Sequence, residues 1–152
     1  MVDGPQYRVW TPVALGVPLL VGLVVTSTLG DPIALPPGLR ALGWAFTGAF
    51  AVWNGWGLLL MARHRTAVLP GRSTRQLLDR GPFRLSRNPL YLGLIALDIG
   101  TALLWPSVWA LLVVPVGVAL LTWGAIIPEE RYLSAKFGAE YLAYTRRVHR
   151  WL

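Results

Sequence analysis

Long apolar stretches alternate with short polar connections along this chain of 152 residues. A helix needs ~20 apolar residues to cross the ~30 Å hydrocarbon layer of a membrane. The pattern predicts an all-α polytopic membrane protein, a single domain over 1–152, with four transmembrane helices at about 11–29, 39–61, 90–104 and 107–127. The third helix is short, so we expect it to begin inside the preceding turn or to thin the bilayer locally.

Two further helices are predicted outside the membrane. Ser73 and Gln76 have the spacing of a capping box, and Gly81 suits a left-handed helix end, which predicts a short cytoplasmic loop helix between them. Beyond Pro128, the pattern predicts an amphipathic C-terminal helix over 129–147. Its apolar positions recur at helical spacing on one face, at Leu133, Phe137, Tyr141, Tyr144 and Val148. This helix is either an interfacial anchor or a lid over the third and fourth spans.

Composition supports the membrane class. The chain is 55% hydrophobic and only 14% charged, whereas soluble domains carry about 25% charged residues. The net charge of +7 does not indicate nucleic acid binding, because the aromatic residues lie in the spans and are not interleaved with arginines. The chain has no cysteine, so disulfides, thiolate nucleophiles and cysteine metal sites are excluded, and no His/Asp/Glu cluster has metal-ligand spacing.

The basic residues predict an orientation. All of the 14 lysines and arginines except Arg40 precede the first span, lie between the second and third, or follow the fourth. With four spans these three regions share one side of the membrane, and basic residues mark the cytoplasmic side. We therefore expect a multi-pass protein of the cell (inner) membrane with both termini in the cytoplasm.

Some residues inside the spans are informative. Asp98 and Asn54 are polar, and an aspartate at the centre of a span costs ~2.5–3.5 kcal/mol on insertion scales. Asp98 is therefore expected either in a substrate pocket or in a structural hydrogen bond, and Asn54 in a structural role. Small residues at four-residue spacing predict close helix packing: Ala41, Ala45 and Ala49 in the second span, and Ala96 and Gly100 in the third.

A basic and aromatic turn, residues 81–91, precedes the third span, and a double carboxylate, Glu129-Glu130, follows the fourth. Both lie where membrane meets water. One acidic residue would suffice to stabilise the start of a helix through its dipole. Two adjacent ones beside a basic loop favour a site that holds a cation.

Four fragments match a known signature in order and spacing: Gly81-Pro-Phe83, Arg87-Asn-Pro-Leu-Tyr91-Leu-Gly93, Glu129-Glu130 and Phe137-Gly138-Ala-Glu-Tyr141. Through them, the segment from Gln76 to the carboxyl terminus resembles the isoprenylcysteine carboxyl methyltransferase and phospholipid methyltransferase family of integral membrane enzymes. The resemblance covers roughly half of the chain, and the first two spans carry no such signature.

Members of that family use S-adenosylmethionine, which the resemblance implies here as the cofactor. By position, it implies cofactor contacts from Arg75, Gln76, Leu77, Leu78, Phe83, Asn88, Pro89, Leu90, Tyr91 and Glu129. Asn88 stands where the family has histidine. Its side-chain amide can donate and accept hydrogen bonds, but unlike histidine it does not gain or lose a proton near neutral pH. Ala125 stands where the prenylcysteine enzymes have an arginine for the substrate carboxylate, which disfavours a prenylcysteine substrate.

The resemblance thus implies an S-adenosylmethionine-dependent methyltransferase, isoprenylcysteine carboxyl methyltransferase-like, acting on a lipophilic or small amphipathic acceptor at the cytoplasmic membrane interface. Glu129 would hold the polar end of the donor, with Tyr91 and Phe83 covering its adenine or sulfonium. Glu130 and Asp98 are candidate bases if the nucleophile is an amine or thiol. The alternatives are an NADPH-dependent membrane reductase, which has a similar carboxyl-terminal segment, and a non-enzymatic four-helix membrane scaffold. The acceptor atom and the oligomeric state stay open.

Overall fold

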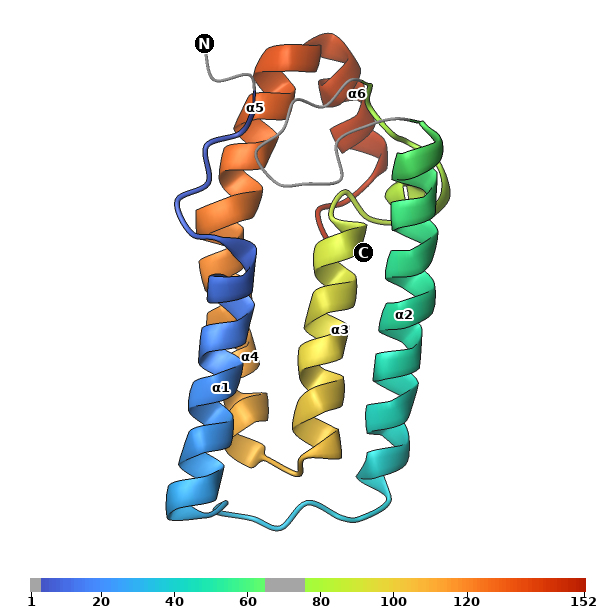
Figure 1. Ribbon diagram of the computed structural model, residues 1–152. Coiled ribbons are helices and arrows are strands. Elements are labelled where there is room, and N and C mark those ends of the chain that lie inside the picture. The colour runs from blue at the N-terminus through green and yellow to red at the C-terminus, as the bar shows by residue number, and fades with distance from the viewer. Residues whose placement is uncertain (1–3, 65–75) are drawn as a thin grey trace.

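Four long helices run alternately up and down one axis in the computed structural model, which describes residues 4–64 and 76–152 (Figure 1). They are α1 (Thr11–Leu29), α2 (Leu39–Arg63), α3 (Pro89–Leu104) and α4 (Val108–Leu121). The α1–α2 and α3–α4 connections lie at the lower end, and the shorter elements gather at the upper end. The all-α fold is confirmed, and its helices begin and end within two residues of the first three predicted spans.

The outer faces of these helices are apolar and exposed. Within the described residues, three helical stretches are long and apolar enough to cross a membrane: Thr11–Leu29, Leu39–Arg63 and Val108–Phe137. Large apolar side chains such as Val17, Leu20 and Leu112 are at least half exposed, which suits contact with lipid. The chain is therefore a multi-pass membrane protein, and α3, with 16 residues, is a shorter apolar helix.

Helix packing relies on two glycines, of which the small-residue spacing indicated Gly100 but not Gly43. The closest pairs are α1 with α4 and α2 with α3. A Cβ on Gly43 of α2 would lie 3.1 Å from the Gly100 carbonyl oxygen of α3, and one on Gly100 would lie 3.0 Å from the Gly43 oxygen. The predicted stripe of Ala41, Ala45 and Ala49 is exposed instead, so that prediction was wrong. Small size permits close packing but does not decide which face of a helix packs.

The fourth span does not end at Pro128, as the sequence had suggested. Helix α4 continues through a π-helical turn, η2 (Thr122–Ile126), into α5 (Ile127–Phe137). The helix breaks instead at Gly138, with φ of 51°, before α6 (Ala139–Arg147). The predicted single helix over 129–147 is thus two helices, the first of them continuous with the span.

Pro128 explains the π-helical turn. Proline has no N–H and its ring clashes with the carbonyl four residues earlier, here that of Gly124. The Ile127 N–H bonds to the Thr122 carbonyl, five residues back, which widens the turn. The released Gly124 carbonyl accepts hydrogen bonds from the N–H groups of Arg8 (2.8 Å) and Val9 (3.3 Å). The N-terminal segment is thereby fastened to the bundle.

The short loop helix is also different from the prediction. Residues 76–80 are not helical, while Ser73 and Arg75 lie outside the described residues. Gly81 does have a left-handed φ of 56°, but it begins a 3-10 helix, η1 (Gly81–Arg84), rather than ending a helix. Pro82 follows it, and its fixed φ suits the first turn of a helix.

Candidate functional site

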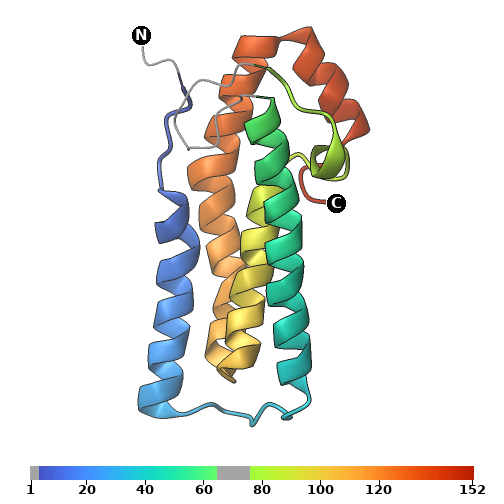
Figure 2. The same cartoon turned by 45° about the vertical axis from the view of Figure 1, so that its right-hand side comes forward.

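The turn between η1 and α3 is bonded to the last residues of the chain. The Arg87 N–H donates to the His149 carbonyl (2.9 Å). The Ser86 hydroxyl and the Asn88 side-chain amide both donate to the Arg150 carbonyl, at 3.2 and 3.0 Å. Figure 2 shows the chain ending beside this turn, with α6 above it. Asn88 therefore has a structural role in positioning the turn.

Glu130 lies at the centre of an ion-pair network. Arg87 donates to its Oε1 at 2.9 Å, and Arg150 donates to its Oε2 at 2.7 Å and to its Oε1 at 3.0 Å. The same Arg87 nitrogen also approaches the Tyr141 hydroxyl at 3.5 Å. Hydrogen bonding to Glu130 raises the pKa of Arg150. Both oxygens of Glu130 are therefore engaged by guanidinium groups that join the turn, α5 and the tail.

Glu129, its neighbour in the chain, has different partners. The Tyr91 hydroxyl donates to its Oε2 at 3.0 Å, and Tyr7 of the N-terminal segment also hydrogen-bonds to it. These donors are neutral phenols. Unlike Glu130, Glu129 has no arginine or lysine within ion-pair distance among the described residues. These hydrogen bonds orient its carboxyl group, and no ion pair among the described residues engages it.

Aromatic residues of α6 form one wall of the site. Tyr141 and Tyr144 are buried with Val148, and Leu77, Leu133 and Phe137 pack around them. The predicted apolar face is therefore confirmed, but it packs on the loop rather than over the third and fourth spans. The Tyr144 hydroxyl donates to the Phe83 carbonyl at 2.6 Å. Burial raises the pKa of both tyrosines, so they remain neutral hydrogen-bonding groups at physiological pH.

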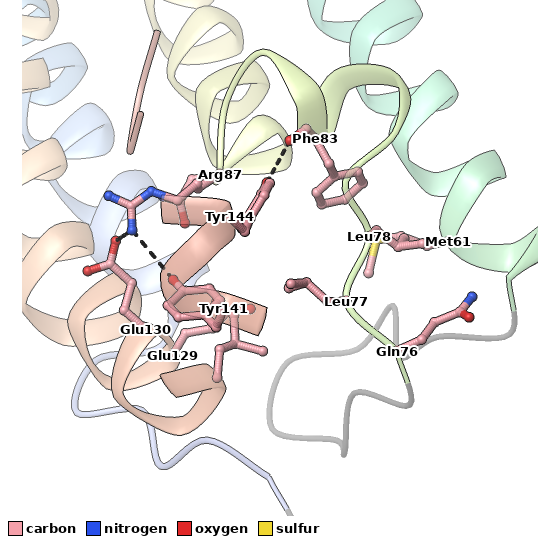
Figure 3. Close-up of a pocket in the computed structure, with 12 residues that line it drawn as sticks. Met61, Gln76, Leu77, Leu78, Phe83, Arg87, Glu129, Glu130, Tyr141 and Tyr144 are labelled. Carbon is pink, nitrogen blue, oxygen red and sulfur yellow. Dashed lines mark hydrogen bonds and ion pairs between the residues drawn. The ribbon is translucent and has the colours of Figure 1, made fainter. Parts of the chain in front are cut away.

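A hollow lies between these elements, with acidic groups on one side and apolar groups on the other (Figure 3). It spans about 600 Å³, including the part open to solvent. Twelve residues line it: Met61, Gln76, Leu77, Leu78, Phe83, Arg87, Asn88, Glu129, Glu130, Leu133, Tyr141 and Tyr144. The Arg87 Nε atom is buried without a partner among the residues described. Carboxylates, aromatic rings, amides and an unsatisfied donor together suit a ligand with both polar and ring-bearing parts.

Seven predicted site residues line this hollow: Gln76, Leu77, Leu78, Phe83, Asn88, Glu129 and Glu130. Other predicted residues do not. The Pro89 and Leu90 carbonyls accept hydrogen bonds from the side chains of Trp53 (2.9 Å) and Asn54 (3.2 Å), so these two residues join α3 to α2. The expected structural role of Asn54 agrees with this bond.

Tyr91 and Asp98 also lie away from the lining of the hollow. The Tyr91 hydroxyl is instead bonded to Glu129, which does line the hollow. Asp98 is buried in α3, seven residues further along the helix than Tyr91 and on the same face. Arg75 lies outside the described residues, so its predicted cofactor contact has no structural counterpart here.

Five lining residues were not among the predicted site residues: Met61, Arg87, Leu133, Tyr141 and Tyr144. Helical spacing did group Leu133, Tyr141 and Tyr144, but it did not indicate that their face borders the carboxylates. No sequence pattern pointed to Tyr7 or Arg150. They reach the carboxylates only because the two ends of the chain fold back.

Comparisons with known proteins give one match. A family model described as phospholipid methyltransferase matches residues 40–140. No curated protein and no solved structure matches. The matched range begins in α2, which had shown no signature in the sequence, and it ends before Tyr141, Tyr144 and Arg150.

Proposed function

The chain belongs to the phospholipid methyltransferase family, and from this membership we propose that it transfers a methyl group from S-adenosylmethionine to a lipophilic or small amphipathic acceptor at the cytoplasmic membrane interface. Membership itself implies a membrane methyltransferase that uses this donor on lipid substrates. The observation that carries the proposal is the hollow in which an uncompensated carboxylate, Glu129, faces aromatic and apolar walls.

The residues of the hollow divide the binding of the donor between them. Glu129 attracts the ammonium group at the amino-acid end of the donor, which S-adenosylhomocysteine also carries, because no cation of the described chain competes for it. Phe83, Tyr141 and Tyr144 offer ring faces, which attract a cation and stack on a flat base. Gln76 donates to the His64 carbonyl at 3.1 Å and so places its amide at the α2 side of the entrance.

S-adenosylmethionine supplies an electrophilic methyl group on a positively charged sulfur. The protein's part is to align an acceptor behind that methyl group and to exclude water. Leu77, Leu78 and Leu133 form the apolar lining that serves the second purpose. An acceptor from the bilayer would enter along these side chains.

The geometry bears differently on the two candidate general bases, Glu130 and Asp98. Glu130 already accepts from Arg87 and Arg150, so taking up a proton would weaken those bonds. We therefore assign Glu130 to positioning the turn and the tail. Asp98 is buried away from the hollow's lining, and a role in proton transfer would require a path along α3. Both observations favour an acceptor that needs no nearby general base.

We further propose that the protein spans the inner membrane four times. In this topology the short helix α3 also crosses the membrane, and both termini lie in the cytoplasm. The four helices alternate in direction, so both ends of the chain and the hollow lie toward one end of the bundle (Figure 1). Among the described residues, every lysine and arginine except Arg40 belongs to a segment at that end.

Ligand binding to purified protein tests the proposal. S-adenosylhomocysteine is expected to bind and to raise the melting temperature, and Glu129→Gln is expected to lower its affinity at least roughly tenfold by calorimetry. Glu140→Gln is the matched control, because Glu140 is exposed on α6 and does not line the hollow. Stabilisation by NADPH but not by S-adenosylhomocysteine would favour a reductase, and equal affinity in both variants would remove Glu129 from the site.

A further inference from the structure

A second hollow lies beyond the wall of the first. Asp79, Arg80, Gly81, Arg84, Tyr144 and Arg147 contribute to its lining, and it spans about 1000 Å³, including the part open to solvent. Tyr144 lines both hollows, and its hydroxyl is bonded to the Phe83 carbonyl of η1. Phe83 lines the first hollow, while Gly81 and Arg84, on either side of it in η1, line the second. Tyr144 and η1 thus separate two distinct sites.

The second hollow carries an excess of positive charge. Three arginines face a single carboxylate, Asp79, which pairs with Arg147 at 3.7 Å. The Arg147 side chain is 66% exposed and the Asp79 side chain 48% exposed, so the ion pair is weak. Arg80 and Arg84 have no ion-pair partner in the described part of the chain. Guanidinium groups bind phosphate through paired hydrogen bonds, so the arrangement suits a phosphate group.

Apolar side chains lie beside these arginines. Gly81 packs so closely on α2 that a Cβ there would lie 3.2 Å from the Trp56 indole. Trp56 is 47% exposed, and Leu85, the residue after Arg84, is 54% exposed. Tryptophan is enriched where membrane meets water, with lipid headgroups at the same level. A phosphate held by the arginines could therefore have acyl chains attached, lying along α2.

We propose that this second hollow binds the phosphate group of an anionic phospholipid of the surrounding membrane. The net charge of the hollow favours a headgroup without its own cation, and the adjacent Trp56 and Leu85 favour a lipid over free phosphate. The site is separate from the hollow assigned to the methyl donor and does not depend on that assignment.

Titration of the full-length protein in a neutral detergent with dihexanoyl phosphatidylglycerol, without S-adenosylhomocysteine, tests this site. Calorimetry is expected to show saturable binding that weakens at least roughly tenfold in Arg80→Gln/Arg84→Gln. Arg147→Gln and Arg146→Gln are a matched pair, since the residues are adjacent on α6 and only Arg147 lines the hollow. The former is expected to weaken binding severalfold, and the latter to leave it within twofold.

Two further probes identify the ligand. Dihexanoyl phosphatidylcholine is expected to bind more weakly than phosphatidylglycerol, and inorganic phosphate weakest. Equal binding of both lipids, displacement of the lipid by millimolar phosphate, or equal losses in the Arg146 and Arg147 variants would each overturn the proposal. All of the substituted arginines are exposed, so each variant is expected to fold. Circular dichroism and melting temperature check this.

Discussion

At the scale of single residues, hydrogen-bond partners give two adjacent carboxylates different roles. Glu130 is bonded to the guanidinium groups of Arg87 and Arg150, so its charge is balanced inside the protein. Glu129 is bonded to the phenols of Tyr91 and Tyr7, which orient its carboxyl group without forming an ion pair. Under the proposed function, a cationic group of the ligand therefore binds to Glu129 and not to Glu130.

Tyr91→Phe tests the orienting role. Removing the hydroxyl takes away the 3.0 Å hydrogen bond to Glu129 and leaves the ring in place. A hydrogen bond to a charged group is worth ~1.5–3 kcal/mol. Because this bond is already present without ligand, only part of that energy contributes to binding, and we expect S-adenosylhomocysteine affinity to fall roughly three- to tenfold. Calorimetry measures it, with Tyr132→Phe as the control, since the Tyr132 hydroxyl accepts from Lys136 on the surface of α5. An unchanged affinity in Tyr91→Phe would mean that Glu129 is held by other contacts.

The residues that sequence could identify are those in compact motifs. The turn around Asn88 and the pair Glu129-Glu130 were found because adjacent, recognisable residues carry them, and the structure brings them to one hollow. Tyr7 and Arg150 were missed because they reach Glu129 and Glu130 across long sequence separations. Such contacts depend on where the chain ends lie, which local spacing does not encode.

At the scale of elements, Pro128 widens a helix rather than ending it. A proline after an apolar span ordinarily predicts a boundary, and that rule failed here because the released carbonyl found new partners. The N–H groups of Arg8 and Val9 bond to the Gly124 oxygen, so the distortion costs little. As a result, Glu129 lies on a helix continuous with the span and is fixed by it.

Gly124→Ala tests this junction. An added Cβ would lie 2.5 Å from the Val9 Cβ and 3.1 Å from its backbone nitrogen, which would force the N-terminal segment off the π-helical turn. Overpacking of this kind costs ~1–3 kcal/mol, so we expect a lower melting temperature in detergent. Gly48→Ala is the matched control in α2, because nothing lies within 4 Å of its added Cβ and alanine favours helix. Equal stability of the two variants would show that the segment is not held there.

At the scale of the whole molecule, both chain ends complete the site. The N-terminal segment supplies Tyr7 to Glu129, and the C-terminal tail supplies Arg150 to Glu130. The family match over 40–140 contains neither end. The matched region therefore provides the bundle and the carboxylates, while the flanking segments fix the orientation of those carboxylates.

Deletion of residues 149–152 tests the contribution of the tail. The turn would lose the His149 and Arg150 carbonyls, and Glu130 would lose one of its two arginines. We expect S-adenosylhomocysteine affinity to fall roughly tenfold while the helical circular dichroism is retained, since each lost hydrogen bond is worth ~0.5–1.5 kcal/mol. His149→Ala is the control, because it keeps the backbone carbonyl. Full affinity in the truncated protein would contradict a role for the tail.

The first three long helices were predictable in position but only partly in their contacts. Apolar length gave α1, α2 and α3 to within two residues, because burial in lipid demands it. The packing face of α2 was not predictable, since lipid-facing and protein-facing positions are both apolar. The exposed stripe of Ala41, Ala45 and Ala49 and the buried Gly43 show that residue size alone does not distinguish them.

The shortness of α3 has a consequence for where this enzyme works best. At 16 residues it extends ~24 Å, less than the ~30 Å of an average hydrocarbon layer. Its first residue, Pro89, directly follows Asn88, which lines the hollow. Under the proposed topology, a thick bilayer would strain the helix at its site end, whereas lipids with short acyl tails would relax it. The turnover rate would then be higher in lipids with short acyl tails than in lipids with long ones, so activity would depend on membrane thickness.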